Sequence, residues 1–365
     1  MKMEKKVLFV TYKKPPKIME GGGQGAKKNY DMVCAEVGQD NVVCYYVHDE
    51  EKKKSLWQYL CGAFFMLFNY YFGLTPGRVK RIVRMAADFD VVFIDRTLFG
   101  ILAKKLKQSG YKGKIVSYFH NVERIYFDAK VSPKIPFRGV LIHCADVNDR
   151  YSCEFSDVIV ALNERDRGLI ADIYGRSADF LVPVALPDRL NVEPSDEMTS
   201  TQPLCLFLGA YFGPNNDGIL WFVKNVLPKV NIRMKIVGKG MAKLKAENEC
   251  LSDIEVHSDV PVLDPFINEA DVMILPIFSG SGMKVKTCES LMYGKNIIAT
   301  SEAFEGYDVD YDKVGGKCDT AEEFIRILKD FEREPRRRFN EYSREMYLRK
   351  YSNDSIRGVY ADILK

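Results

Sequence analysis

The stretch SGSGMKVKTCESLMYGKNIIAT, residues 279–300, places two lysines and one carboxylate behind a glycine-rich turn. The residues after the turn predict a helix that begins near Met283 and ends at Gly294. Amide groups at the start of a helix bind anions, and the helix dipole adds to this preference. Lys284 and Lys286 lie in the same first turn, where cations oppose the dipole unless an anion is bound. The segment therefore predicts a phosphate site.

Glu289 follows Lys286 by about one helical turn. A carboxylate at this distance can bind a vicinal diol, as the acids of dinucleotide-binding folds bind ribose. Cations for a diphosphate and a carboxylate for a ribose together predict a nucleotide ligand. A structural interpretation stays open, in which Glu289 pairs with Lys286 at i,i+3 on a solvated helix.

A second group of polar residues follows two apolar runs in the first half of the chain, KIVSYF (114–119) and DVVFID (90–95). A lone histidine is usually structural, but the carboxyl ends of parallel strands are where open α/β sheets bind ligands. The second group therefore predicts contacts to a substrate, with Arg96 suited to a phosphate on the acceptor. Its members are His120, Asn121, Glu123, Asp95 and Arg96.

Apolar, β-branched runs alternate with stretches compatible with helices along the whole chain, which predicts an α/β protein with doubly wound parallel sheets. Predicted strands cover 7–12, 41–47, 90–95, 114–119 and 157–162, then 204–210, 234–238, 253–260, 271–277 and 296–300. Helices are predicted at 215–227 and 284–294, and three more at 321–332, 335–350 and 353–364. The Pro-, Ser- and Asp-rich stretch 182–203 reads as a linker. We expect a first Rossmann-like domain at 1–185, a linker at 186–203, a second domain at 204–345, and a C-terminal helix at 346–365 that packs on the first domain.

Residues 279–300 resemble the nucleotide-sugar signature of the large retaining family 4 of GT-B glycosyltransferases. The matching residues are Gly280-Ser281-Gly282, Lys286, Glu289, Gly294-Lys295, Asn296–Ala299 and Thr300. The resemblance covers most of the chain. Residues 207–228 are similar to the opening of the family's donor domain, FHNVE (119–123) to a segment of its acceptor domain, and GGGQGAKKNY (21–30) to its first glycine-rich loop.

The resemblance implies a GT-B fold with two Rossmann-like domains facing a cleft. It also implies that Glu289 binds the donor ribose, that Lys286 and the main chain of Gly282 and Met283 bind the diphosphate, and that His120 contacts the transferred sugar. Further donor contacts are expected at Gly280, Ser281, Lys284 and Gly209. Ser281 stands where many members have a glutamate, and 209–215 lacks their Arg and Lys. Lys284 and Lys286 would then supply the charge.

Gly21-Gly22-Gly23-Gln24-Gly25 follows the first predicted strand and precedes a helix expected to begin near Ala26. The spacing is not GxGxxG, and no acidic residue closes a tight dinucleotide unit after it, which argues against NAD. Glycine lets a backbone approach a ligand closely. We therefore expect Gly22 and Gly23 to contact a phosphate or sugar of the donor, with a flexible surface loop as the alternative.

The composition excludes several classes of function. A formal net charge of +3 gives no overall attraction to nucleic acid. Nine cysteines without CxxC or paired Cys/His spacing indicate neither zinc nor a disulfide framework. Asp88-Phe89-Asp90 and Asp308-Val309-Asp310 have the DxD form, which is short and common, so we expect no obligatory metal and no cofactor. The first apolar run is too short for a signal peptide, so a cytoplasmic protein is expected.

LWQYLCGAFFMLFNYYFGL (56–74) is apolar and aromatic, with basic residues on both sides of it. A membrane span there would separate strands 7–12 and 90–95, which should share one sheet, so a span is rejected. A buried helical hairpin and an in-plane contact with the membrane through 52–84 both stay open.

These observations predict a retaining hexosyltransferase that moves a sugar from a UDP- or GDP-linked donor to a saccharide acceptor, in surface polysaccharide or glycan assembly. The acceptor would be lipid-linked if 56–74 faces a membrane, with the protein peripheral on the inner face. Two alternatives stay open: an epimerase or sugar-phosphate synthase on the same fold, and a catalytically silent subunit that binds a partner.

Overall fold

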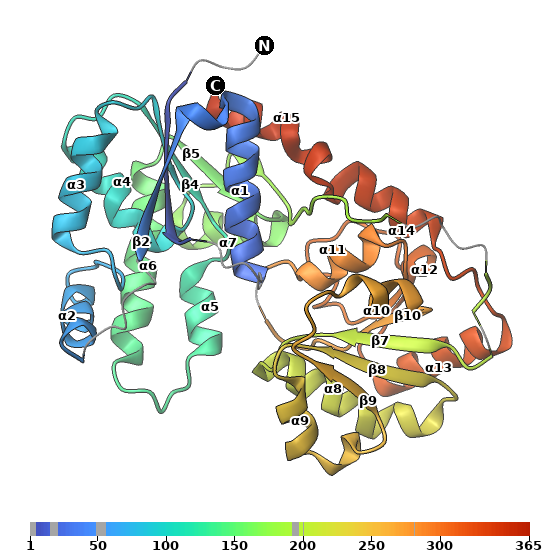
Figure 1. The fold of residues 1–365 in the computed structure, drawn as a ribbon. Coiled ribbons are helices and arrows are strands. Elements are labelled where there is room, and N and C mark those ends of the chain that lie inside the picture. Colours follow the sequence, from blue (N-terminus) through green and yellow to red (C-terminus); the bar gives the residue numbers. More distant parts are fainter. Residues whose placement is uncertain (1–4, 15–20, 49–55, 192–196, 200, 281) are drawn as a thin grey trace. The chain divides into compact units, whose positions relative to one another are not determined.

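The computed structural model describes the chain except residues 1–4, 15–20, 49–55, 192–196, 200 and 281. The chain divides into two compact units (Figure 1). Unit 1 comprises Met1–Pro183 together with Ile356–Lys365, and unit 2 comprises Val184–Ser355. The C-terminal segment therefore belongs to the first unit although it follows the second in sequence.

Unit 1 is built on a six-stranded sheet in the order β2-β1-β3-β4-β5-β6, in which every neighbouring pair is parallel. The order reverses between β1 and β3, and ligands of open parallel sheets bind at such a reversal. The strands are β1 Val7–Lys13, β2 Val42–His48, β3 Val91–Ile94, β4 Lys114–Tyr118, β5 Val158–Ala161 and β6 Phe180–Leu181.

Parallel strands need crossover connections, and helices provide them in unit 1. They are α1 Gly21–Val37, α2 Leu56–Met66, α3 Pro76–Ala86, α4 Gly100–Gln108, α5 Glu123–Lys130, α6 Arg138–Phe155 and α7 Glu164–Tyr174, with 3₁₀ turns at Gln39–Asn41 and Thr97–Phe99. The last helix, α15 (Asn353–Leu364), packs on α1. The Tyr360 hydroxyl donates to Asn29 Oδ1 at 2.5 Å, and Arg357 Nε lies 2.8 Å from Glu36 Oε1.

Unit 2 repeats this arrangement with a second all-parallel sheet, ordered β12-β11-β10-β7-β8-β9. Its order reverses between β7 and β10. The strands are β7 Leu204–Leu208, β8 Arg233–Gly238, β9 Glu255–Ser258, β10 Val272–Leu275, β11 Asn296–Ala299 and β12 Gly315–Lys317. Its helices are α8 Gly213–Asn225, α9 Met241–Glu247, α10 Asp264–Glu269, α11 Val285–Met292, α12 Tyr311–Val314, α13 Ala321–Arg333 and α14 Glu341–Met346, with 3₁₀ turns at Leu227–Lys229 and Glu249–Leu251 and a π-helical turn at Tyr347–Tyr351.

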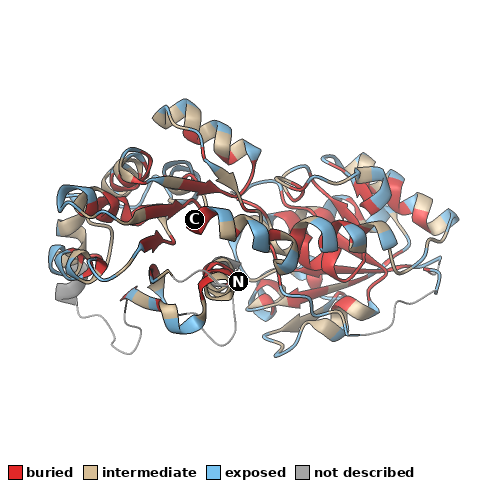
Figure 2. Ribbon diagram, turned by 90° about the horizontal axis from the view of Figure 1, so that it is seen from above, coloured by how far each residue is buried: buried red, intermediate tan, exposed pale blue. Residues whose placement is uncertain are grey.

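The central strands of both sheets are buried on both faces, which explains their continuous apolar sequences (Figure 2). Every residue of β3, β7, β10 and β11 is buried. The core of unit 1 fills the space between the sheet and helices α3, α4 and α6. Hydrophobic burial therefore fixes the sheets and, with them, the loops at the ends of the strands.

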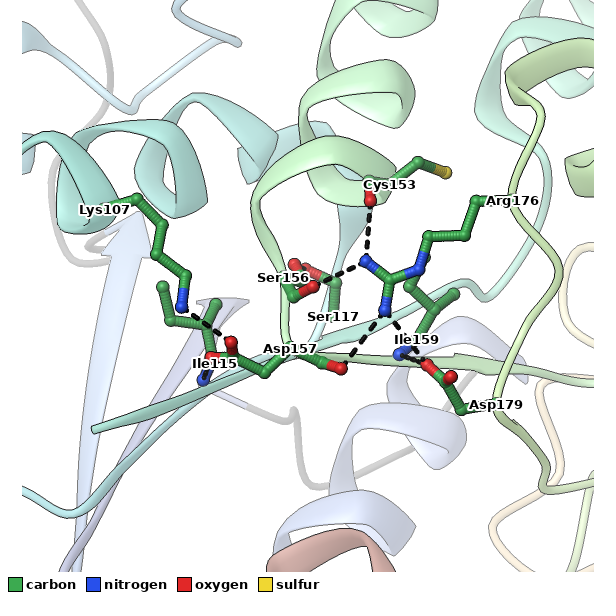
Figure 3. A network of polar contacts seen from close by, with 9 residues as sticks. All are labelled: Lys107, Ile115, Ser117, Cys153, Ser156, Asp157, Ile159, Arg176 and Asp179. Carbon is green, nitrogen blue, oxygen red and sulfur yellow. Dashed lines mark hydrogen bonds and ion pairs between the residues drawn. The ribbon is translucent and has the colours of Figure 1, made fainter. Parts of the chain in front are cut away.

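The starts of β4, β5 and β6 are joined by a polar network around Arg176 (Figure 3). Its guanidinium donates to the carbonyls of Cys153 and Ser156, at 2.8 and 2.6 Å, and so satisfies the C-terminal end of α6. Asp157 and Asp179 accept the main-chain amides of Ile115 and Ile159, at 2.8 and 2.7 Å. This network fixes the ends of the strands opposite to those that carry the candidate site.

All ten predicted strands are present, with differences of a few residues at their ends. Sequence analysis missed β6 and β12. Two-residue β6 is too short to show a period, and β12 is Gly-Gly-Lys, a composition that disfavours strands. The helix predicted at 335–350 is replaced by α14 and a π-helical turn, since α14 begins only at Glu341 behind its Asn340 cap.

Of the two interpretations left open for 56–74, the buried helical hairpin is wrong. Helix α2 ends at Met66, and turns follow in which Asn69 and Gly73 have φ of 64° and 95°. Such left-handed residues end helices. Among the described residues, no helix has both the length and the apolar character needed to cross a bilayer.

Candidate active site

In unit 2 the predicted phosphate-binding segment lies at the reversal of strand order. The loop after β7 carries Gly209, and the loop after β10 leads through Gly280 and Gly282 into α11. Helix α11 begins at Val285 with Lys284 as its N-cap, two residues later than expected, so Lys286 stays in the first turn. The main-chain amides at the start of α11 and the Lys286 side chain therefore lie in the same helical turn.

The Lys286 side chain interacts with one residue of β7 and with one residue of α8, the helix that follows β7. Its Nζ donates to Asn215 Oδ1 of α8 at 2.6 Å and lies 4.9 Å from the centroid of the Phe207 ring. Burial, together with the charge of Lys284, lowers the pKa of Lys286 to about 7, although the charge of Glu289 opposes this. A buried ammonium group is unfavourable without an opposite charge nearby, and an anionic ligand would supply that charge.

Glu289 lies on α11 and is 7% exposed. Its Oε1 accepts from Arg189 at 3.1 Å, so the alternative of an exposed i,i+3 pair with Lys286 is wrong. Burial raises the pKa of Glu289, and the Arg189 guanidinium opposes this effect. Sequence analysis missed Arg189, because it lies in a linker whose local pattern indicates only irregular structure.

Lys284 is neutralised within unit 2. Its Nζ lies 2.5 Å from Glu302 Oε1 and 2.9 Å from the Gly282 carbonyl. Gly280 has φ of 155°, and a Cβ there would come within 3.2 Å of Lys284 Cε, so a side chain would disturb this pair. Met283 is buried, with its Sδ 3.5 Å from the amide of Val184. Ser281, a predicted donor contact, lies outside the described residues.

Gly218 brings α8 against the end of β10 and so places Asn215 beside Lys286. A Cβ on Gly218 would lie 1.8 Å from the Pro276 carbonyl oxygen, whereas one on Gly213 of the same helix would meet nothing within 4 Å. Backbone cannot yield as a flexible side chain can.

We therefore expect Gly218→Ala to lower the free energy of unfolding by about 2–4 kcal/mol, despite the better helix propensity of alanine. Gly213→Ala should be neutral or slightly stabilising. Urea unfolding of both variants beside the wild type measures the difference. Equal stability of the two variants would contradict the close contact of α8 with β10.

In unit 1, His120 belongs to a buried polar cluster at the reversal between β1 and β3. Its Nε2 lies 3.2 Å from Asp95 Oδ1, which also accepts from Asn29 Nδ2 at 2.7 Å. Asp95 Oδ2 accepts from the Thr11 hydroxyl at 2.9 Å. Burial lowers the pKa of His120, although the carboxylate opposes this. A neutral imidazole that donates from Nε2 to Asp95 leaves Nδ1 as an acceptor.

Contact of Asp95 with an acceptor stays a prediction, and the structure gives the carboxylate three partners within unit 1. The residue is 0% exposed, and Thr11, Asn29 and His120 occupy its carboxylate. Burial raises the pKa of Asp95, but the charge and hydrogen bond of His120 more than offset this, and the pKa falls below its usual value. Asp95 therefore orients His120.

The loop expected at Gly21–Gly25 is helical, because α1 begins at Gly21 rather than near Ala26. Glycine is less favourable than alanine by about 1 kcal/mol at each helical position. Because the segment is rich in glycine, the predicted helix began too late. Gly22 and Gly23 thus lie in the first turn of α1. A Cβ on Gly25 would come within 3.0 Å of His120 Cε1, so glycine there lets α1 approach the imidazole. Contact of Gly22 and Gly23 with a donor stays a prediction.

Arg96, Asn121 and Glu123 also follow the ends of β3 and β4. Asn121 lies in the bend between β4 and α5, and Glu123 is the first residue of α5. Glu123 is 1% exposed, and its Oε1, like Arg96 Nε, is buried without a hydrogen-bond partner among the described residues. Burial raises the pKa of Glu123 to about 7, against the effect of the Arg96 charge. Sequence analysis missed its buried neighbour Asp149, which accepts from Thr97 Oγ1 at 2.6 Å and whose pKa burial and Glu123 raise.

Glu123→Gln should change how stability depends on pH. Because the folded pKa of Glu123 lies above the unfolded value, the folded protein binds the extra proton between about pH 4.5 and 7. This residue therefore costs stability as the pH rises through that window. The variant should be more stable than the wild type by about 2–3 kcal/mol at pH 8, and nearly equal to it at pH 4.5. Denaturant unfolding at both pH values checks this, and an equal difference at both would contradict the raised pKa.

Among the described residues, no group of three or more His, Cys, Asp or Glu side chains is placed to hold a metal ion. Asp90, from one of the DxD segments, accepts the Lys6 amide at 2.8 Å at the start of β3. This position is at the opposite end of the strand from Asp95.

Residues 202–328 match the model of the family described as glycosyl transferases group 1. Comparison with curated proteins finds no significant match. Similar solved structures include the sucrose-phosphate synthase from Thermosynechococcus elongatus, with a TM-score of 0.74, 10% identity and 98% of each chain covered. HepE from Anabaena, solved in complex with UDP and glucose, has a TM-score of 0.64, 13% identity and 99% of each chain covered. The lipopolysaccharide outer core galactosyltransferase WaaB has a TM-score of 0.62 and 14% identity, with 97% of this chain and 99% of that chain covered.

At these identities the solved structures inform on the fold, and the family model informs on unit 2. Both six-stranded parallel sheets are matched by these structures over nearly the full chain. The chain therefore has the GT-B fold, and within it residues 202–328 match the model of the glycosyl transferases group 1 family.

Proposed function

We propose that this protein is a glycosyltransferase that transfers a hexose, with retention of configuration, from a UDP- or GDP-linked donor to a saccharide acceptor. The observation that carries the proposal is the environment of Lys286. This cation stands in the first turn of α11, at the reversal of strand order in unit 2. Its Nζ donates to Asn215, and among the described residues no carboxylate lies within hydrogen-bonding distance of it. A nucleoside diphosphate supplies the charge that this position favours.

In the proposed reaction Lys286 and the amides of Gly282 and Met283 bind the diphosphate, which leaves with the bonding electrons of the glycosidic bond. Positive charge stabilises that leaving group as it develops. Glu289 binds the ribose hydroxyls, with Arg189 holding the carboxylate in place before the donor binds. The distance of 3.1 Å between Arg189 and Glu289 supports this role for Arg189.

In unit 1 His120 contacts the transferred sugar as the bond to the diphosphate breaks. The acceptor hydroxyl attacks on the same side and passes its proton to the oxygen of the leaving diphosphate. No enzyme nucleophile is required for this course. The lowered pKa of His120 supports the proposal, because burial favours the neutral imidazole, and a neutral imidazole tolerates positive charge developing on the sugar better than an imidazolium does. Arg96, Asn121 and Glu123 are proposed to contact the acceptor.

A thermal-shift screen against UDP, GDP, ADP, CMP and their common sugar conjugates tests the proposal. A ligand at 100 times its Kd stabilises the folded state by about 2.7 kcal/mol. We expect a shift with one nucleotide, lost in Glu289→Ala, and turnover only with the matching sugar conjugate. A folded protein that responds to none of the nucleotides would contradict the proposal and favour a catalytically silent subunit.

We further propose that the acceptor is lipid-linked and that the protein acts in surface polysaccharide or glycan assembly as a peripheral membrane protein. The apolar character of 56–74 supports this setting. The alternative of a sugar-phosphate synthase differs in its acceptor, so transfer to a sugar phosphate in preference to a lipid-linked saccharide would decide for it.

A further inference from the structure

Two segments of unit 1 expose large apolar side chains to solvent. At the end of α2 and in the turn after it, Phe64, Leu67 and Phe68 are 56%, 59% and 56% exposed. In the loop between α5 and α6, Ile135 and Phe137 are 52% and 74% exposed. Single exposed apolar residues are ordinary, but five in two short segments of one unit are not.

Both segments lie towards the lower end of unit 1 in Figure 1, and the turn after α2 is tied to α5 and α6, the helices that the second segment connects. The rings of Tyr71, after α2, and Phe127, in α5, are in contact with centroids 6.2 Å apart. Asn148 of α6 donates to the Asn69 carbonyl at 3.0 Å, which ties the turn after α2 to α6. Phe137 precedes α6, about 15–17 Å along its axis from Asn148. We call the five exposed residues and their turns the apolar end of unit 1.

The loop that carries Ile135 and Phe137 is held in a defined conformation. Arg138 Nε donates to the Val131 carbonyl and Arg138 Nη2 to the Asp128 carbonyl, both at 2.8 Å. Phe137 has φ of 66°, a left-handed conformation that costs a residue other than glycine roughly 1–2 kcal/mol. The protein thus fixes a strained backbone while leaving the aromatic side chain in solvent, and such strain commonly marks a functional site.

Exposed cations lie on the segments next to the apolar end. Lys130 and Lys134 flank the α5–α6 loop, and Lys80, Arg81 and Arg84 lie along the outer face of α3, which follows the α2 segment. The exposed Asp128 nearby is paired with Arg138 at 2.5 Å. Each cation near an anionic lipid surface adds about 1 kcal/mol to binding. The charge therefore complements acidic headgroups.

We propose that the apolar end of unit 1 docks on an anionic phospholipid surface, with its aromatic and aliphatic side chains at the boundary between headgroups and acyl chains. A lipid surface fits better than a protein partner, because the apolar residues project from two turns and basic residues accompany them. The contact includes the α5–α6 loop, which sequence analysis did not assign to it. This proposal extends the proposed function by placing the enzyme where a lipid-linked acceptor would lie.

Sedimentation with vesicles tests the proposal without donor or acceptor, so it can fail independently of the glycosyltransferase proposal. The full chain should bind vesicles of phosphatidylcholine with 30% phosphatidylglycerol and bind pure phosphatidylcholine at least tenfold more weakly. Phe64→Ser/Phe68→Ser/Ile135→Ser/Phe137→Ser should reduce binding to the acidic vesicles more than tenfold. Lys130→Glu/Lys134→Glu should lose most of the preference for acidic vesicles.

The matched control is Val262→Ser/Met198→Ser, which removes two apolar side chains of unit 2 that are 52% and 53% exposed. The control should bind like the wild type, and the nucleotide thermal shift of every variant should be unchanged. Vesicle binding that survives the fourfold variant would overturn the proposal. So would a wild-type dimer in solution that the fourfold variant dissociates, because the apolar end would then bind a second copy of the chain.

Discussion

Replacing Lys286 with methionine should abolish nucleotide binding, lower turnover by 10²–10³-fold or more, and leave the ligand-free protein at least as stable as the wild type. Methionine keeps the aliphatic length of the side chain and can pack on Phe207, which lies 4.9 Å from the ammonium group. It removes a charge whose burial is costly, and buried charges are often replaced by apolar residues without loss of stability. The loss of binding follows because the diphosphate loses its nearest formal positive charge on α11.

The pH dependence of nucleotide binding tests the same residue in the wild type. Burial lowers the pKa of Lys286 to about 7, so the ligand-free lysine is mostly neutral at pH 8 and above. A bound diphosphate raises that pKa again, and binding must then take up a proton. Above pH 7 the nucleotide phosphate is fully ionised, so affinity should fall by up to tenfold per pH unit.

Calorimetric titration at pH 7.5 and 8.5, in buffers of different ionisation enthalpy, measures this uptake. A proton uptake near zero would contradict the role of Lys286, as would a Lys286→Met variant that binds nucleotide normally. Lys313→Met is the control, because Lys313 is 64% exposed and pairs with Asp310 on the surface of unit 2. In the ligand-free protein the lowered pKa also makes stability rise with pH from about 7 towards 10.5, and Lys286→Met should remove that slope.

Replacing Asp95 with asparagine should lower turnover by about 10²-fold or more without affecting the nucleotide thermal shift. The carboxylate accepts from Thr11, Asn29 and His120, and an amide would turn one of these contacts into a meeting of two donors. The imidazole would then change tautomer or turn away, and loss of an orienting carboxylate is costly in catalysis. We expect a loss of stability of about 1–3 kcal/mol, because the cluster is buried.

A double-mutant cycle with His120→Ala separates orientation from general damage. If Asp95 acts through His120, the double variant should be no slower than His120→Ala alone. A double variant whose loss of turnover equals the product of the two single losses would contradict that role. Full turnover of the Asp95→Asn variant would contradict it as well. Asp90→Asn provides the control, because it makes the same chemical change at the other end of β3, where the carboxylate is exposed and accepts the Lys6 amide.

Much of the fold follows from local sequence. Strands such as 91–94 and 272–275 are fully buried in parallel sheets, so their continuous apolar runs indicated them. The geometry of the signature at 279–300 could also be predicted locally, because a strand, a glycine turn and a helix that are adjacent in sequence must be adjacent in space. These features placed Lys286 and Glu289 on one helix without any knowledge of the rest of the chain.

The partners of those residues depend on contacts between distant parts of the chain. Arg189 is 100 residues from Glu289, and Asn215 is 71 residues from Lys286. Asn29, which holds Asp95, is itself held by Tyr360, 331 residues away. Local patterns report which face of an element is buried, but they do not report which distant element covers it. The sequence thus determined the order of elements and the chemically active residues, whereas tertiary packing decided that Asp95 is buried beneath His120 and that Lys284 is neutralised.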